Sequence, residues 1–195
     1  TDPERRQKLE AALPALDRIA IHWARDNKVP GLAWGIVIDG ELARFGSSGK
    51  RNVESGGTID EDTIFRIASM TKSFTALAIL KLRDAGKLEL DAPVARYLPE
   101  LANWQPATSD SGPVTIRHLL THTAGFPEDN PLGDRQMAIS QEEFSAWLSA
   151  GIPFSTATGS AHEYSNYGFA MLGAVVTAVA GVPYREYVNR EILAP

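Results

Sequence analysis

The stretch Phe65-Arg-Ile-Ala-Ser-Met-Thr-Lys-Ser-Phe74 opens the segment that decides the fold. Apolar residues continue behind it at helical spacing, and Gly86 supplies a typical helix end. The pattern predicts a helix from about residue 69 to residue 85. Ser69 and Lys72 are three residues apart at the start of this helix, so we expect their side chains to share one face.

Ser69 and Lys72 are the first candidate catalytic pair. A serine hydroxyl is a poor nucleophile until a base accepts its proton, and the shared face holds Lys72 within reach. The positive end of a helix also disfavours an ammonium and offers backbone N–H groups to an oxyanion. Alternatively, Ser69 only caps the helix and Lys72 is a solvated residue of the first turn. A second Ser-x-x-Lys, Ser47-Ser48-Gly49-Lys50, lies in a glycine-rich stretch that predicts a loop and so defines no shared face.

Tyr164-Ser165-Asn166 is the second candidate motif, just before a predicted apolar helix. A phenol beside an ammonium can serve as a base or relay, and an asparagine amide can hold a carbonyl or orient the lysine. Alternatively, the motif is a turn in which Asn166 caps the helix. A similar triplet, Tyr187-Val188-Asn189, lies inside a predicted final helix.

The two motifs, in this order, resemble those of the serine β-lactamase and penicillin-binding protein superfamily. The class C-like branch is most similar; it includes D-Ala-D-Ala carboxypeptidases, D-aminopeptidases, class C β-lactamases and related esterases. The resemblance runs from about residue 15 to residue 195 and rests on four blocks: Phe65–Phe74, Gly86–Pro93, Val114–Phe126 and Glu163–Gly168.

The resemblance implies a role for each of four residues. Ser69 would be the acylated nucleophile, and Lys72 its proton acceptor or electrostatic partner. Tyr164 would be the general base or relay, and Asn166 a ligand of substrate and lysine. The implied function is a serine acyl hydrolase that forms a covalent acyl-enzyme on an amide, ester or β-lactam carbonyl of a small-molecule or peptide substrate. No metal or organic cofactor is implied.

The family's third motif, a Lys-Thr-Gly or His-x-Gly triplet, does not occur in this sequence. Family members are also longer, and their remaining strands lie beyond this point. We therefore expect an N-terminal portion whose missing C-terminal strands a second polypeptide carries, or an inactive fragment. The alternative function is a non-catalytic ligand-recognition or regulatory domain of the same fold.

The expected fold class is α/β (α+β): an incomplete antiparallel sheet flanked by helices, plus an all-helical lobe, with the site between them. Strands are predicted at 32–38 and 41–45 around an Asp39-Gly40 turn, followed by a loop over 46–57. Residues 1–90 and 183–195 would belong to the α/β domain, and residues 91–182 to the helical lobe. Further helices are predicted at 115–122, 141–148, 166–180 and 183–193, and one before Pro30 that starts at Asp2-Pro3.

Composition excludes several classes of protein. The chain has 195 residues, 44% of them hydrophobic, which is typical of a folded protein rather than a disordered one. Its net charge of −5 argues against a nucleic-acid partner. The apolar run Phe169–Val182 is too short to span a membrane, so we predict a buried core helix. No leader is visible, and a periplasmic or secreted location is expected from the resemblance alone.

His118 and His122 are spaced i, i+4, which could present two imidazoles to a metal. No third ligand stands in place, because Leu119 occupies the position of the glutamate in the common zinc helix. We therefore expect a packed or solvated histidine pair. A nucleophile elbow, Gly-x-Ser-x-Gly, does not occur either.

Overall fold

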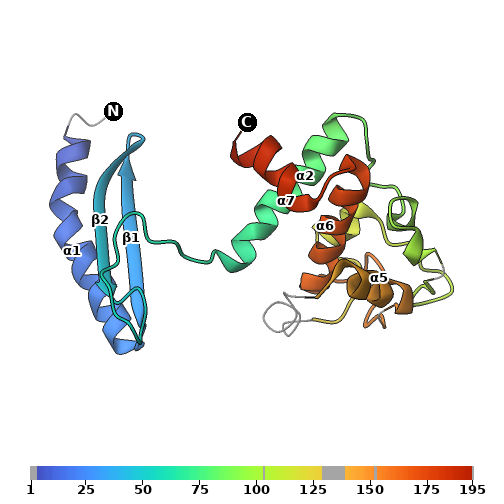
Figure 1. Cartoon of the computed structure of the whole chain (residues 1–195), viewed down its shortest axis with the longest axis horizontal. Helices are drawn as coiled ribbons and strands as arrows, with labels where there is room; N and C mark the ends of the chain where they lie inside the picture. The colour runs from blue at the N-terminus through green and yellow to red at the C-terminus, as the bar shows by residue number, and fades with distance from the viewer. Residues whose placement is uncertain (1–3, 103, 129–138, 152, 195) are drawn as a thin grey trace. The chain divides into compact units, whose positions relative to one another are not determined.

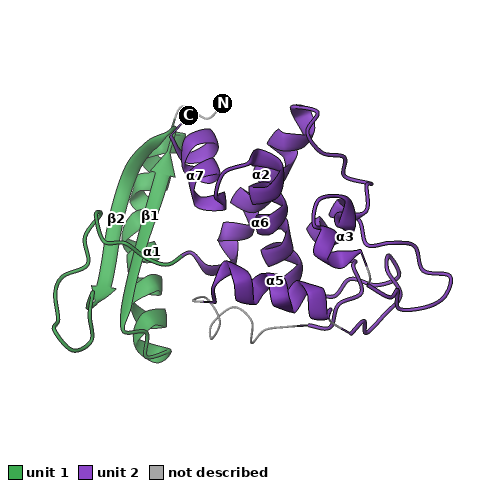
Figure 2. Cartoon of the chain, turned by 45° about the vertical axis from the view of Figure 1, so that its right-hand side comes forward, with its two compact units in different colours: residues 1–66 green, residues 67–195 purple. Residues whose placement is uncertain are grey.

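The computed structural model describes residues 4–102, 104–128, 139–151 and 153–194. It divides into two compact units, residues 1–66 and residues 67–195 (Figures 1 and 2). The first unit combines one helix with a two-stranded sheet, and the described part of the second is helical. Each unit is described by itself.

The first unit is built from helix α1 (Arg5–Asp26) and strands β1 (Gly31–Ile38) and β2 (Glu41–Gly49). The strands pair antiparallel, with one irregularity in register between Ile36 and Val37. Asp39 and Gly40 have φ values of 53° and 84°, the positive values that a tight two-residue hairpin requires. The predicted hairpin is confirmed.

Strand β2 is longer than predicted, because residues 46–49 belong to it rather than to a loop. They lie opposite residues 31–34 of β1, so ladder hydrogen bonds outweigh their glycine-rich composition. Gly46 is required here, since a Cβ at this position would overlap the Trp34 ring. Residues 47–49 of the second Ser-x-x-Lys copy therefore belong to strand β2, and Lys50 directly follows the strand.

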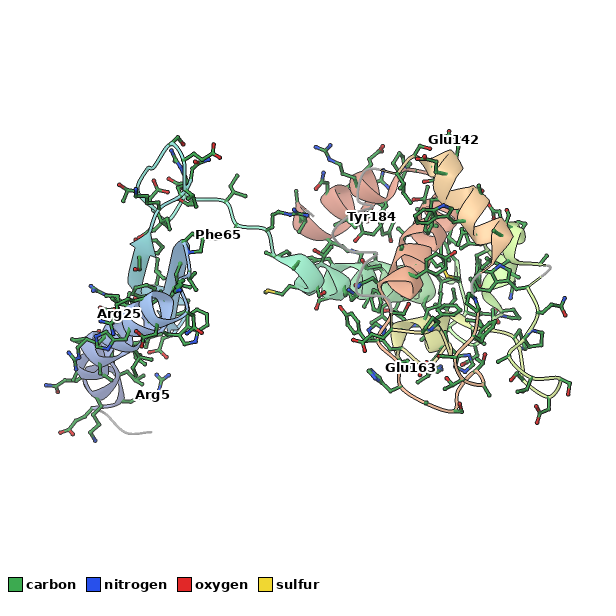
Figure 3. All side chains as sticks on the ribbon, turned by 90° about the horizontal axis from the view of Figure 1, so that it is seen from below. Arg5, Arg25, Phe65, Glu142, Glu163 and Tyr184 are labelled. Atoms are coloured by element: carbon green, nitrogen blue, oxygen red, sulfur yellow. The ribbon has the colours of Figure 1, made fainter. Side chains whose placement is uncertain are left out.

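Helix α1 is continuous through Pro14, although a proline inside a helix removes one backbone hydrogen bond. Arg5 and Arg25 mark its two ends (Figure 3). The N-cap residue is Glu4, and the predicted Asp2-Pro3 start lies outside the described residues.

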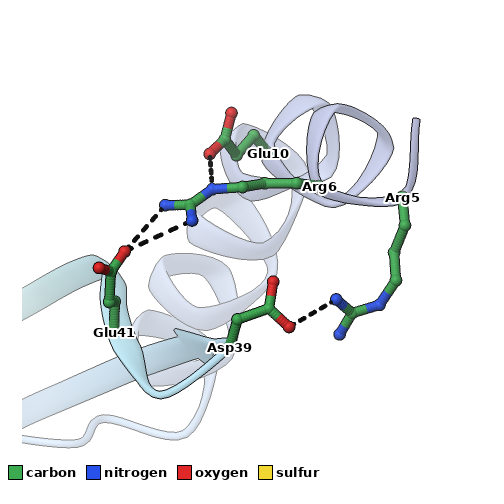
Figure 4. A network of polar contacts seen from close by, with 5 residues as sticks. All are labelled: Arg5, Arg6, Glu10, Asp39 and Glu41. Atoms are coloured by element: carbon green, nitrogen blue, oxygen red, sulfur yellow. Dashed lines mark hydrogen bonds and ion pairs between the residues drawn. The ribbon is translucent and has the colours of Figure 1, made fainter. Parts of the chain in front are cut away.

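Ion pairs join the first turns of α1 to the hairpin (Figure 4). The Arg5 guanidinium lies 2.7 Å from Asp39, and that of Arg6 lies 3.0 Å from Glu10 and 3.3 Å from Glu41. All five side chains are about half exposed or more, so each pair adds little stability.

The second unit packs its helices around one core. Its helices are α2 (Thr71–Asp84), α3 (Ile116–Leu120), α5 (Gln141–Ala150), α6 (Asn166–Ala180) and α7 (Tyr184–Val188). Short helical turns are η1 (Ala68–Met70), η2 (Val94–Arg96), η3 (Pro99–Leu101) and the π-helical η4 (Asn189–Leu193). The largest fully buried side chains are those of Ile79, Leu82, Val94, Ile116, Leu119, Phe126, Leu148, Met171, Leu172, Val175 and Val176.

Helix α6 lies at the centre of this unit and contacts α2, α3 and α7. Its bounds are those predicted. Its fully buried face is centred on Met171, Leu172, Val175 and Val176, whereas Phe169, the first residue of the predicted core run, is only partly buried. The difference arises because helices pack on more than one side of α6.

The expected mixed fold with an incomplete antiparallel sheet is present in the described residues. The predicted α/β domain (residues 1–90 and 183–195) and helical lobe (residues 91–182) were defined for a sheet with further strands. This division stays a prediction. Among the described helices none is long and apolar enough to cross a membrane alone; α6 and the segment Tyr184–Leu193 pass that test only as a pair bent by 79°.

Candidate active site

The nucleophile candidate lies where an extended segment turns into a helix. Ala68 has φ of 44°, a left-handed conformation rare for alanine, and η1 continues directly into α2. Ser69 thereby occupies the first turn, and its side chain is exposed. The helix-cap alternative does not describe it, because Ser69 Oγ contacts Tyr164 and Lys72 instead.

The start of α6 positions the second motif. Ser165, 3% exposed, is the N-cap, and its Oγ accepts the Gly168 N–H at 3.0 Å. Asn166 is therefore the first residue of the helix and not its cap, which corrects the capping alternative. Tyr164 directly precedes the cap, so its backbone is held by a well-defined helix start.

The structure brings all four predicted site residues together within the second unit. The hydroxyl oxygens of Ser69 and Tyr164 lie 2.7 Å apart, and either group can be the donor. The Lys72 Nζ donates to Ser69 Oγ at 3.2 Å and to Asn166 Oδ1 at 2.6 Å. A continuous hydrogen-bonded chain therefore links phenol, serine, amine and amide.

Aromatic rings surround the amine. Lys72 Nζ lies 4.7 Å from the centre of the Tyr164 ring and 5.6 Å from that of Phe169. Ring faces attract a cation at this range. Sequence reasoning placed Phe169 in the apolar run of the core helix and missed this contact, although its position one helical turn after Asn166 was a usable signal.

His122 is the second residue that sequence reasoning missed. Its ring centre lies 4.6 Å from that of Tyr164 and 5.1 Å from that of Phe169. Its Nδ1 accepts the Ser165 N–H at 3.1 Å, and its carbonyl accepts the Glu163 N–H at 2.8 Å. The only available signal was its place in the block Val114–Phe126.

His118 has a separate, structural role. Its Nδ1 accepts the Thr115 N–H at 3.2 Å, while Thr115 Oγ1 accepts the His118 N–H, which makes a capping box for α3. Burial lowers the pKa of His118. Within the described ranges, no three histidine, aspartate or glutamate side chains gather as a possible metal site.

The arrangement supplies a nucleophile, a proton acceptor and backbone N–H donors, which are groups that attack on a carbonyl requires. An exposed alcohol contacts a phenol that can accept its proton, and a lysine amine donates to that alcohol. The alcohol also lies in the first turn of a helical segment, where backbone N–H groups lack intrahelical acceptors.

Comparison with known proteins places most of the chain in one family. The family model described as Beta-lactamase matches residues 7–195. Esterase EstB of Burkholderia gladioli is 34% identical over 194 residues, which cover 92% of this chain and 48% of EstB. The D-alanyl-D-alanine-carboxypeptidase/endopeptidase AmpH of Escherichia coli K12 is 30% identical over 190 residues, covering 95% of this chain and 48% of AmpH.

A solved structure shows the same fold. The octameric penicillin-binding protein homologue from Pyrococcus abyssi superposes with a TM-score of 0.77 at 33% identity, over 93% of this chain and 42% of that one. The chain thus spans about half the length of the curated relatives it matches. With a family match over nearly its whole length and relatives named for hydrolytic activities, this chain belongs to the Beta-lactamase family.

Proposed function

We propose that this chain supplies the nucleophile half of a serine acyl hydrolase that acts through a covalent acyl-enzyme. The observation that carries the proposal is the pair of contacts at Ser69 Oγ, 2.7 Å to the Tyr164 hydroxyl and 3.2 Å to Lys72 Nζ. A serine in a purely structural role needs neither a phenol nor an amine on its hydroxyl.

The proposed first step is attack of Ser69 Oγ on a carbonyl carbon. A new C–O bond forms, and the hydroxyl proton passes to the Tyr164 oxygen. In this assignment Tyr164 starts as a phenolate, whose negative charge is stabilised by the Lys72 ammonium that donates to Ser69 and lies over the Tyr164 ring. Accepting the serine proton turns Tyr164 into a neutral phenol. Backbone N–H groups of the first helical turn stabilise the oxyanion.

The second step is collapse of the tetrahedral intermediate. The bond to the leaving group breaks, the leaving group takes the proton from Tyr164, and the acyl group stays on Ser69. Water then attacks the acyl-enzyme and gives a proton to Tyr164. The bond between the acyl carbon and Ser69 Oγ breaks, the carboxylic acid leaves, and Ser69 Oγ takes the proton back from Tyr164. In an alternative assignment Lys72, also in contact with Ser69 Oγ, is the proton acceptor and Tyr164 the relay.

The proposed substrates are small molecules or peptides with an amide, ester or β-lactam carbonyl. Support comes from the names of the relatives, one an esterase and one a D-alanyl-D-alanine carboxypeptidase/endopeptidase. Because the relatives are about twice as long, we propose that activity needs further strands and the third motif, carried by a longer polypeptide or a second chain. A periplasmic or secreted location is part of the same proposal, and cell fractionation tests it.

Covalent labelling tests the function. The full-length protein, with any co-purifying chain, is treated with a fluorophosphonate, and the adduct is mapped by mass spectrometry; turnover of a chromogenic ester is followed in parallel. We expect an adduct on Ser69 and loss of both signals in Ser69→Ala. Ser47→Ala, in the other Ser-x-x-Lys copy, is the matched control and should retain both.

Two results would overturn the proposal. Full turnover by Ser69→Ala would assign the chemistry to another residue. A folded wild-type protein that binds the ester or a penicillin without adduct or turnover would favour the non-catalytic recognition domain instead.

A further inference from the structure

We propose that His122 is a positioning residue that holds the Tyr164 hydroxyl on Ser69, an inference that rests on the proposed function of that serine. His122 belongs to a loop that follows α3 and is far from Tyr164 in the sequence. Its hydrogen bonds described above are to the residues on either side of Tyr164, and its ring lies against those of Tyr164 and Phe169.

His122 holds the backbone on both sides of Tyr164. Its carbonyl accepts the N–H of Glu163, the preceding residue, at 2.8 Å. Its Nδ1 accepts the N–H of Ser165, the following residue, at 3.1 Å. One residue therefore holds the Ser165 N–H, in the peptide group directly after Tyr164, and the N–H of Glu163, the residue before it.

The His122 ring also restricts the Tyr164 side chain. The two ring centres lie 4.6 Å apart with planes inclined by 32°, a close tilted stack. The backbone bonds fix the origin of the side chain and the ring contact limits its rotation. Together they leave the phenol oxygen 2.7 Å from Ser69 Oγ.

The backbone of His122 is itself in an unfavourable conformation. Its φ of 57° lies in the left-handed region, where glycine or asparagine would be less strained. This conformation places the carbonyl and the side chain so that both reach the Tyr164 segment. A strained histidine is expected where its side chain is needed, and glycine could make only the backbone bond.

The hydrogen bond from the Ser165 N–H determines which nitrogen of the His122 ring carries the proton. An Nδ1 that accepts a hydrogen bond has no proton, so the ring is in the form that carries hydrogen on Nε2. Phenylalanine at this position would keep a ring and remove the acceptor. Asparagine would keep an acceptor and tolerate the left-handed backbone, but would remove the ring. These two substitutions separate the two contributions.

A double-mutant cycle in the full-length protein tests the inference, with the rate of Ser69 labelling by a fluorophosphonate as readout. We expect His122→Phe to slow labelling about tenfold to a hundredfold, because sub-ångström placement of the base is lost. His122→Asn should recover part of that loss. In a Tyr164→Phe background, His122→Phe should change the rate less than about twofold, since the group it positions is already absent.

His162→Phe is the control. His162 stacks edge-on against His122 at 5.5 Å between ring centres, and its loss should leave the labelling rate within about twofold of wild type. An equal loss from His122→Phe in the wild-type and Tyr164→Phe backgrounds would show a general structural effect and overturn the inference. A wild-type rate in His122→Phe would overturn it too.

A second measurement does not depend on Ser69 being reactive. Hydrogen exchange of the Ser165 amide should be at least about tenfold faster in His122→Phe than in wild type, because its acceptor is gone. An unchanged exchange rate contradicts the positioning role. If the amide responds as expected but wild-type Ser69 is never labelled, then the proposed function fails and the structural link between His122 and Tyr164 holds.

Discussion

The Lys72 Nζ donates to Asn166 Oδ1 at 2.6 Å, which joins the first turn of α2 to the first residue of α6 across 94 positions of sequence. The amine also donates to Ser69 Oγ, so the Asn166 amide holds in place the amine that contacts the nucleophile. A half-buried amine needs such an acceptor, because burial without one is costly.

Asn166→Leu should therefore slow Ser69 labelling by about tenfold or more, since the amine loses its acceptor and no longer holds a fixed place beside Ser69. The rate of fluorophosphonate labelling in the full-length protein measures this. Asn189→Leu, in the similar triplet Tyr187-Val188-Asn189, is the matched control and should label at the wild-type rate. Equal rates for the two variants would contradict a role for Asn166 in the site.

The stability of the protein should fall in mild acid because of His118. Burial lowers the pKa of His118 below its usual 6.5, and its Nδ1 must stay unprotonated to accept the Thr115 N–H. The unfolded chain then binds a proton at higher pH than the folded one. The stabilisation is fully present above about pH 6.5 and is lost as the pH falls through the lowered folded value.

His118→Gln isolates this effect, because glutamine also suits the third position of a capping box and does not titrate. Urea unfolding at pH 7.5 and pH 5.5 should show a smaller loss of stability in His118→Gln than in wild type. The same loss in both proteins would rule out His118 as the source.

Ala68→Gly should stabilise the protein by up to about 1 kcal/mol. The left-handed backbone at Ala68 costs a residue with a Cβ about 1–2 kcal/mol, partly offset by the greater freedom of glycine in the unfolded chain. Ala76→Gly, inside α2, is the opposing control and should destabilise by about 1 kcal/mol. Thermal unfolding measures both, and a shift of the same sign in the two variants would refute the explanation.

Tyr184→Phe should destabilise the second unit by about 1–2 kcal/mol. The Tyr184 hydroxyl, on the first residue of α7 (Figure 3), lies 2.7 Å from Thr75 Oγ1 on α2. Thr75 is 5% exposed and would keep only a long bond to the Thr71 carbonyl. In urea unfolding, Tyr184→Phe with Thr75→Val should cost less than the sum of the single changes. Strict additivity would show that the two hydroxyls do not interact.

Local signals predicted most of the helices and the hairpin. Asp39-Gly40 determines its turn through its own backbone preferences, and the motif before α6 carries its own cap in Ser165. The predicted strand at 41–45 was too short, because pairing with β1, and not the composition of residues 46–49, decides the length of β2.

The four motif residues of the candidate site could be picked out from the sequence, but the distances between them could not. The spacing of Ser69 and Lys72 places them on one face by helix geometry alone. That Tyr164 reaches Ser69 depends on α2 packing against α6, which no local pattern contains. His122 escaped prediction because its role depends on a left-handed backbone and on hydrogen bonds to residues more than forty positions away.

The two-stranded sheet has a consequence for handling the protein. Among the described residues each strand pairs on one side only. The outer edge of β1 belongs to Gly-Leu-Ala-Trp-Gly-Ile-Val-Ile, eight residues without a charge or a proline. Such an edge is a template for intermolecular strand addition, and this octapeptide has the character of an amyloid-forming segment. A strand added to this edge would therefore also guard β1 against fibril growth.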